Sequence, residues 1–368
     1  MPSYILGFTI AFMLTFLIIP LIIQFTNVKS LYDKPNGRKV HKFPTPTLGG
    51  IAIFAGFFIA LTLTFNLQQL SDVKFIIYAS AFMVITGVID DILSITFVKK
   101  ALTQLISTLL IVYWDGIRIT DAYGLFGLHT LDPVTSLIVT MLVVFTIINA
   151  VNFIDGIDGN ASMHGIFILA CFGIWFHFTG NQTYALLAMI TIGAFAAFLR
   201  YNYSPAKIFM GDTGSLFMGL IISVLSIKFL QMNKFVVGTF HVPAAPSVLL
   251  GLLIVPVFDI FRLIIVRLKN GKSPFNPDQN HIHHNMLILG FGHNQASFIL
   301  LSITVFFTLI SIVFKNANTN LLFAIHAATS VLMLSFMTYR LKKREDSLLK
   351  IFNLSNFKFN LQKQKQNN

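Results

Sequence analysis

The chain is poor in charge, and in acidic residues above all. Charged residues make up 11% of its 368 positions, and only 14 of them are Asp or Glu. An average soluble domain carries about 25% charged residues. Since 55% of the chain is hydrophobic, with 39 Phe, the composition excludes an ordinary soluble domain and predicts an all-α, polytopic membrane protein.

Cysteine is almost absent. Cys171 is the one cysteine in the sequence, and it lies within an apolar run. A single cysteine excludes a disulfide framework within the chain and most thiolate metal sites. We expect Cys171 to be a small hydrophobic side chain that faces lipid or a neighbouring helix.

Long apolar runs fill most of the chain. The first, 4–25, is too long for the core of a signal peptide, and no small-x-small cleavage site follows it, so we expect an uncleaved first helix. About 20 apolar residues are needed to span a bilayer, which predicts about eleven transmembrane helices. They are expected near residues 4–25, 48–66, 73–93, 100–114, 133–150, 161–179, 183–199, 214–230, 246–266, 296–314 and 320–340.

The net charge of +12 is distributed as in a membrane protein. Most Lys and Arg residues fall in the odd-numbered connections between these spans and in the carboxy-terminal segment. This bias places those parts in the cytoplasm and the amino terminus outside, and it argues against a nucleic-acid partner. We therefore expect a transmembrane catalytic domain over 1–340 and a basic, disordered cytoplasmic tail over 341–368 that is attracted to anionic lipid.

Five segments rich in polar residues lie in odd-numbered connections, hence on the predicted cytoplasmic face, where they can build one active site. The competing class is a polytopic transporter or lipid flippase, whose functional residues would be spread towards mid-membrane. The segments are PNGRKVHKFPTPTLGG (35–50), GVIDD (87–91) with the lysines that follow it, NAVNFIDGIDGN (149–160), YNYSPAKIFMGDTGS (201–215) and NGKSPFNPDQNHIHH (270–284).

Acidic residues are concentrated in these segments. A carboxylate at the end of an apolar run is costly and seldom lies there without a function, and several together indicate a divalent cation with a phosphorylated ligand. Asp212 precedes Thr213 and a long helix, whose free N–H groups suit phosphate. It is therefore the candidate ligand of Mg²⁺, with Mn²⁺ as an alternative ion; a simple helix cap is the other reading. The five acids are Asp90, Asp91, Asp155, Asp158 and Asp212.

The third segment repeats a polar residue every three positions. Asn149, Asn152, Asp155 and Asp158 share this spacing, which keeps them near one face of a helix or 3₁₀ turn. A polar helix end with turn glycines would look the same.

Asp90 and Asp91 are adjacent, so on a straight helix they cannot face one ligand, and we expect different roles for them. Lys100 follows nine residues after Asp91 and can face back across the connection. A solvated charged turn is the alternative.

Three histidines lie at the end of the segment 270–284. His281, His283 and His284 suit contact with phosphate or sugar; zinc is an alternative, although no Cys lies nearby, and a purely structural role is another. Asp259 and Arg262, three residues apart in a predicted span, are expected to form a structural ion pair.

Taken in order, DD…K, NxxNxxDGxDG, FMGDTGSxxxG and PDxxHIHH resemble the motifs of the polyprenyl-phosphate N-acetylhexosamine-1-phosphate transferases. The form PNxRKxHxxPxPxxGG with HIHH is most similar to the bacterial undecaprenyl-phosphate GlcNAc-1-phosphate transferases of the WecA/TagO type. One position departs: Gln279 stands where Arg is common, which removes a bidentate phosphate contact.

The resemblance implies an enzyme of the bacterial inner membrane that transfers GlcNAc-1-phosphate from UDP-GlcNAc to undecaprenyl phosphate. The products would be undecaprenyl-diphospho-GlcNAc and UMP, in the first membrane step of cell-envelope polysaccharide synthesis. The sugar stays open, with N-acetylfucosamine, N-acetylquinovosamine and muramyl-pentapeptide as alternatives. The oligomeric state stays open too, a homodimer included.

The resemblance also implies roles for single residues. Mg²⁺ on Asp212 would bridge the diphosphate oxygens, Asp90 would orient or deprotonate the lipid phosphate, and Asp91 would help to position the metal or that phosphate. The residues that would hold phosphate oxygens are Lys100, His281, His283 and His284. Those on the substrate side would be His41, Asn149, Asn152, Asp155, Asp158 and Phe209, the last stacking on uracil.

Overall fold

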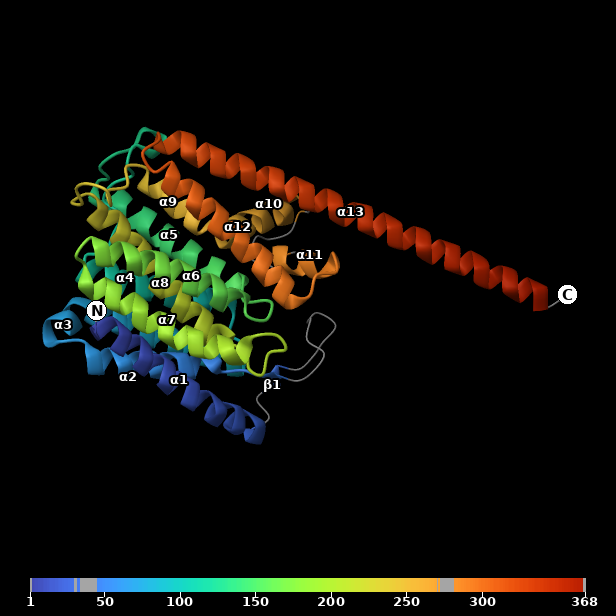
Figure 1. The fold of residues 1–368 in the computed structure, drawn as a ribbon, viewed down its shortest axis with the longest axis horizontal. Helices are drawn as coiled ribbons and strands as arrows, with labels where there is room; N and C mark the ends of the chain where they lie inside the picture. Colours follow the sequence, from blue (N-terminus) through green and yellow to red (C-terminus); the bar gives the residue numbers. More distant parts are fainter. Residues whose placement is uncertain (1, 30–31, 34–44, 270, 272–280, 367–368) are drawn as a thin grey trace.

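The computed structural model is almost entirely helical, and the predicted all-α class is confirmed (Figure 1). It describes residues 2–29, 32–33, 45–269, 271 and 281–366, so His41 and Gln279 lie outside the described residues. A two-residue pairing of β1 (Tyr32–Asp33) with β2 (Thr45–Pro46) is the one small sheet of the described part. The helices are α1 (Pro2–Lys29), α2 (Gly49–Thr64), α3 (Leu67–Leu93), α4 (Phe97–Trp114), α5 (Pro133–Phe153), α6 (Asn160–Phe178), α7 (Gln182–Asn202), α8 (Gly211–Asn233), α9 (Ala245–Leu252), α10 (Ile254–Lys269), α11 (Ile282–Ile288), α12 (His293–Val313) and α13 (Thr319–Gln366), with a short 3₁₀ turn η1 (Leu125–Gly127).

Every predicted span has a helix at its position, but the count of eleven is not confirmed. Among the described residues, eight helices are long and apolar enough to cross a membrane, and a bent pair brings the number to nine. The helices at the two remaining predicted spans, α2 with 16 residues and α4 with 18, stay outside that set. The protein is therefore a polytopic membrane protein.

The ninth predicted span is wrong in one respect, because it is broken. A bend of 82° separates α9 from α10, where we expected one continuous helix over 246–266. The break lies at Leu253, three residues before Pro256 in the first turn of α10, and proline has no N–H with which to continue the hydrogen bonds of α9. The break turns α10 to a new direction and so sets the position of Asp259.

Helix α8 forms the centre of the bundle. In the most apolar stretch of 18 residues of this helix, 94% of the residues are buried within the protein. This is expected for a helix that is hydrophobic all round. Phe217 packs against Phe57, with ring centroids 4.9 Å apart, and against Phe54 at 5.4 Å. A helix held this firmly gives its first turn, which carries Asp212, a fixed position.

Gly87 allows the end of α3 to touch the start of α8. A Cβ on Gly87 would overlap the Cα atom of Thr213 and lie 2.5 Å from its backbone nitrogen. Gly87 and Asp91 are four residues apart, hence on one face of α3. The close approach at Gly87 therefore brings the Asp91 carboxylate to the amino end of α8.

Gly87→Ala is expected to disturb this contact. The added methyl meets backbone rather than a flexible side chain, so α8 must shift, at a cost of about 1–3 kcal/mol, and transferase activity should fall with it. Thermal unfolding and activity of the purified variant test this. Gly173→Ala on α6 is the matched control, because its Cβ would meet its nearest atom, the Ala188 Cβ, at 3.3 Å; equal losses in both variants would contradict the role of Gly87.

The last helix is the longest. Figure 1 shows α13 running past the other helices towards the carboxy terminus. It continues as helix to Gln366, over the segment for which we predicted disorder, and that segment is rich in Leu, Lys and Gln, which favour helices. The division into a catalytic domain and a tail stays a prediction.

Candidate active site

Four helix ends bring the predicted carboxylates together. Asp90 and Asp91 lie at the end of α3, Asn152 at the end of α5, Lys100 in the first turn of α4 and Asp212 in the first turn of α8. Helices of alternating direction place these ends at one end of the bundle. The structure thus joins residues that are up to 122 positions apart in the chain.

Lys100 links two of the carboxylates. Its Nζ atom lies 2.6 Å from Oδ2 of Asp90 and forms a second ion pair with Oδ2 of Asp212. The other oxygen of Asp90 accepts a hydrogen bond from the backbone N–H of Ile95 at 2.7 Å. This bond fixes the turn between α3 and α4, so Lys100 faces back across it, as the spacing predicted.

Asp91 has different partners, all from the start of α8. Its Oδ1 accepts from the N–H of Asp212 at 2.8 Å, and its Oδ2 accepts from the N–H and the hydroxyl of Thr213 at 3.1 and 2.6 Å. Asp91 therefore occupies N–H groups that the sequence offered to phosphate. A carboxylate at this position also interacts favourably with the helix dipole.

Gly211 completes this junction. Its φ of 68° lies in the left-handed region, and a Cβ there would overlap the Asp91 carboxylate. Glycine meets both demands. The motif FMGDTGS thus serves the contact with α3 as well as the exposure of Asp212.

The two asparagines of the segment 149–160 that share the three-residue spacing, Asn149 and Asn152, have different partners. Asn152 donates to Oδ1 of Asp212 at 2.7 Å and to the hydroxyl of Ser215 at 2.8 Å. Asn149 is buried inside the bundle, where it donates to Oε1 of Gln104 at 2.7 Å. Asn152 joins the carboxylate cluster, whereas the hydrogen bonds of the Asn149 side chain hold α4 to α5.

Asp155 lies close to several other negatively charged side chains. Among the described residues its side chain makes no hydrogen bond or ion pair, and burial together with the charges of Asp212, Asp91 and Asp158 raises its pKa well above the usual value. Lys100 is the cation that the described residues supply to this cluster. Several hard oxygen donors with one balancing lysine fit a divalent cation such as Mg²⁺.

Asp158 contacts both the start of α12 and the connection between α7 and α8. Its carboxylate pairs with Nδ1 of His293 at 3.5 Å and accepts from the N–H of Ala206 at 3.2 Å. Burial opposes its ionisation, but the bond and charge of His293, with smaller help from hydrogen bonds, hold its pKa below the usual value. His293 gave no signal in the sequence, since it lies outside every motif.

Phe209 is half-buried just before α8. Its N–H donates to the carbonyl of Pro46 at 2.9 Å, and its carbonyl accepts from Gly49 at 3.0 Å. The start of α2 and strand β2 thus fix the backbone from which this ring projects.

The histidines form a cluster on α11 and just before it. The ring centroids of His283 and His284 lie 4.3 Å apart, and His281 packs edge-on against Phe153 at 5.2 Å. Nε2 of His283 faces Gly156, where a Cβ would overlap it. Burial, with the charges of His284 and His281, lowers the pKa of His283 well below its usual value, so this imidazole is neutral near pH 7.

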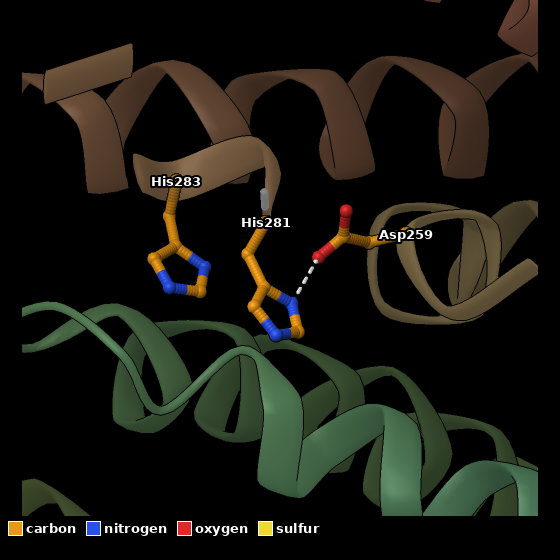
Figure 2. A group of neighbouring side chains, drawn as sticks. All are labelled: Asp259, His281 and His283. Carbon is orange, nitrogen blue, oxygen red and sulfur yellow. Dashed lines mark hydrogen bonds and ion pairs between the residues drawn. The ribbon is translucent and has the colours of Figure 1, made fainter. Parts of the chain in front are cut away.

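Asp259 belongs to this cluster, which the sequence did not suggest. Figure 2 shows its carboxylate facing His281, whose Nδ1 lies 3.0 Å from Oδ2. Ligand atoms of Asp259, His281 and His283 all lie within 4.8 Å of one another, a set that a transition metal could use. The expected pair with Arg262 is present at 3.1 Å.

The chain is similar to known proteins over most of its length. Residues 73–230, which hold the four helix ends, match the sequence profile described as Glycosyl transferase family 4. A probable undecaprenyl-phosphate N-acetylglucosaminyl 1-phosphate transferase of Bacillus subtilis is 30% identical over 325 residues, covering 86% of this chain and 87% of that protein. The chain belongs to glycosyl transferase family 4.

Two further relatives extend the comparison. A decaprenyl-phosphate N-acetylglucosaminephosphotransferase of Mycobacterium leprae is 30% identical over 77% of this chain and 78% of its own. The undecaprenyl-phosphate alpha-N-acetylglucosaminyl 1-phosphate transferase of Escherichia coli K12 is 29% identical over 74% and 73%. The resemblance drawn from the motifs is confirmed, and the transporter alternative is set aside.

Proposed function

We propose that this protein transfers GlcNAc-1-phosphate from UDP-GlcNAc to undecaprenyl phosphate, giving undecaprenyl-diphospho-GlcNAc and UMP. The observation that carries the proposal is the pairing of Asp90 and Asp212 with Lys100, with Asp91 bonded to the first turn of α8 and Asp155 close enough to feel the charge of Asp212. The names of family 4 relatives over most of the chain support the acceptor and the sugar. We further propose that the site faces the cytoplasm of a bacterial inner membrane, with the amino terminus outside.

Phosphoryl transfer needs positioning and charge neutralisation more than covalent help from the protein. We propose Asp212 as the metal ligand, with Asp155 nearby; Mg²⁺ there would neutralise negative charge on the diphosphate. Asn152 and Lys100 orient the Asp212 carboxylate through the contacts described above. Asp91 holds the backbone of the same turn, so all three residues fix one carboxylate.

Asp90 and Lys100 are placed for the lipid phosphate. That phosphate is already largely ionised near neutrality, so its need for a general base is modest, and Asp90 serves to orient it. Lys100 can share its charge between the two carboxylates and a phosphate oxygen, because it lies between them. Neutral His283 and its neighbours would contact the nucleotide sugar from the other side.

The lipid chain needs an apolar path to this site. A cavity of about 460 Å³ lies between α5, α9, α10, the start of α13 and the connection 119–131, and its wall includes Val143 and Ile147 of α5 and Val257 of α10. The same helix α5 carries Asn152 at its end. We propose that part of the polyprenyl chain lies along α5, with its phosphate towards Asn152.

An assay of lipid products tests the substrate. Membranes that contain the protein are supplied with undecaprenyl phosphate and, separately, with UDP-GlcNAc, UDP-N-acetylfucosamine, UDP-N-acetylquinovosamine or UDP-muramyl-pentapeptide. We expect mass spectrometry to find undecaprenyl-diphospho-GlcNAc as the dominant product. Preference for another sugar would overturn the substrate and leave the reaction type, whereas absence of any diphospholipid would overturn both.

A further inference from the structure

Asp259 is a fully occupied hydrogen-bond acceptor inside the protein. The residue is 1% exposed. Its Oδ1 accepts from Nε and a terminal nitrogen of Arg262 at 3.2 and 3.1 Å and from the N–H of Ile282 at 3.0 Å, and its Oδ2 accepts from Nδ1 of His281 at 3.0 Å. A pair within α10 would need only Arg262, yet two of these donors come from the start of α11.

The bond to His281 has a chemical consequence. A carboxylate that accepts from Nδ1–H fixes the orientation of the imidazole ring, while Nε2 stays available for another contact. Figure 2 shows one ring nitrogen of His281 facing Asp259 and the second nitrogen directed away from the carboxylate. The edge contact with Phe153 at 5.2 Å and parallel stacking on His283, 13° between planes, hold the ring in that direction.

Phe153 connects this ring to the carboxylate cluster. It follows Asn152, which bonds Asp212, and precedes Asp155 by two residues. His281 therefore packs on the segment that lines the proposed site.

We propose that Asp259 is a positioning residue that acts through His281: it fixes the ring so that, with a proton on each nitrogen, Nε2–H can donate to a phosphate oxygen of the nucleotide sugar. The inference rests on the proposed function. Arg262 balances the charge of Asp259, and this ion pair offsets part of the free energy needed to bury a carboxylate inside the protein.

A metal ion is the competing occupant of the same cluster. Asp259, His281 and His283 are close enough to share one. Arg262 argues against it, because its guanidinium already binds the carboxylate that would have to be a ligand, and a second buried positive charge would be repelled. Elemental analysis of the purified protein is therefore one arm of the test.

A double-mutant cycle tests the proposal in the full-length protein reconstituted in nanodiscs. The variants are Asp259→Ala, His281→Ala and the double variant, and the readout is kcat/KM for UMP release from UDP-GlcNAc. We expect each single change to lower kcat/KM by about 10- to 100-fold, the size of loss seen when a carboxylate that orients a metal-bound histidine is removed. The double variant should be no worse than His281→Ala, because Asp259 acts through that ring.

Independent losses that multiply in the double variant would overturn the proposal and leave Asp259 a structural residue. A stoichiometric transition metal that disappears in Asp259→Ala would overturn it in favour of a metal site. Asp259→Asn with His281→Gln forms a second cycle if the alanine variants do not fold. Wild-type protein that releases no UMP would instead refute the proposed function.

His326→Ala is the matched control for loss of a buried imidazole. His326 is buried and pairs with the hydroxyl of Ser311 at 2.8 Å, on helices away from the carboxylate cluster. Its loss should lower the melting temperature and leave kcat/KM within about twofold of wild type. A fall in kcat/KM as large as that of His281→Ala would show that general packing, not positioning, explains the cycle.

Discussion

Asp212→Asn is expected to abolish Mg²⁺-dependent release of UMP, with a loss of about 10³-fold or more in kcat, because metal-ion stabilisation of phosphoryl transfer is worth several kcal/mol. The asparagine keeps the size of the side chain but loses the charge that a divalent cation needs. It also places an N–H₂ group where Lys100 or Asn152 now donates. Turnover of purified variant in nanodiscs, titrated with Mg²⁺, measures the effect.

Asp72→Asn is the matched control for this substitution. Asp72 lies in the first turns of α3, at the end opposite to Asp90 and Asp91, and accepts from Gln68. It should keep activity within about twofold, as surface changes of this kind usually do. Near-normal turnover by Asp212→Asn, with an unchanged dependence on Mg²⁺, would remove Asp212 from the metal site.

Asp91→Asn is expected to be damaging for another reason. Three donors at the start of α8 point to this carboxylate, and an amide would turn a donor towards at least one of them. We expect a loss of about 1–3 kcal/mol in unfolding free energy. A loss of about 10²-fold in kcat should accompany it, because a shift of the first turn of α8 misplaces Asp212.

Asp90→Asn is expected to differ from Asp91→Asn in its effects on activity and stability. Its carboxylate bonds Lys100, the N–H of Ile95 and the Asp212 side chain rather than the backbone of α8, so we expect lower kcat with a smaller loss of stability than in Asp91→Asn. Chemical denaturation and Mg²⁺ titration of both variants make the comparison. If Asp91→Asn leaves stability and Mg²⁺ affinity intact, its assignment as the anchor of α8 is wrong.

The sequence predicted the helical class and a helix at each expected position, although not the number of spans, because long apolar runs are a strong signal. It also predicted that Asp90, Asp91, Lys100, Asn152 and Asp212 would meet, since alternating spans bring the odd-numbered connections to one face. These features depend on composition and topology alone. Side-chain partners do not, and there the predictions were less complete.

Several contacts of the site depend on tertiary packing that no local pattern encodes. Asp91 was expected near metal or phosphate, whereas its hydrogen bonds hold the start of α8, where Gly87 lets the two helices touch. Asp259 was expected to pair with Arg262, and the bend between α9 and α10 sets the direction of α10, where His281 also reaches the carboxylate. In each case a backbone feature decides which side chain a carboxylate meets.

The fate of the β-phosphate of UDP-GlcNAc tests the central claim most directly. Purified protein in nanodiscs is given undecaprenyl phosphate, Mg²⁺ and UDP-GlcNAc that carries a radioactive label in that phosphate. The account predicts that the label moves to the lipid and that unlabelled UMP is released. Release of labelled UDP, with the sugar alone on the lipid, would contradict it.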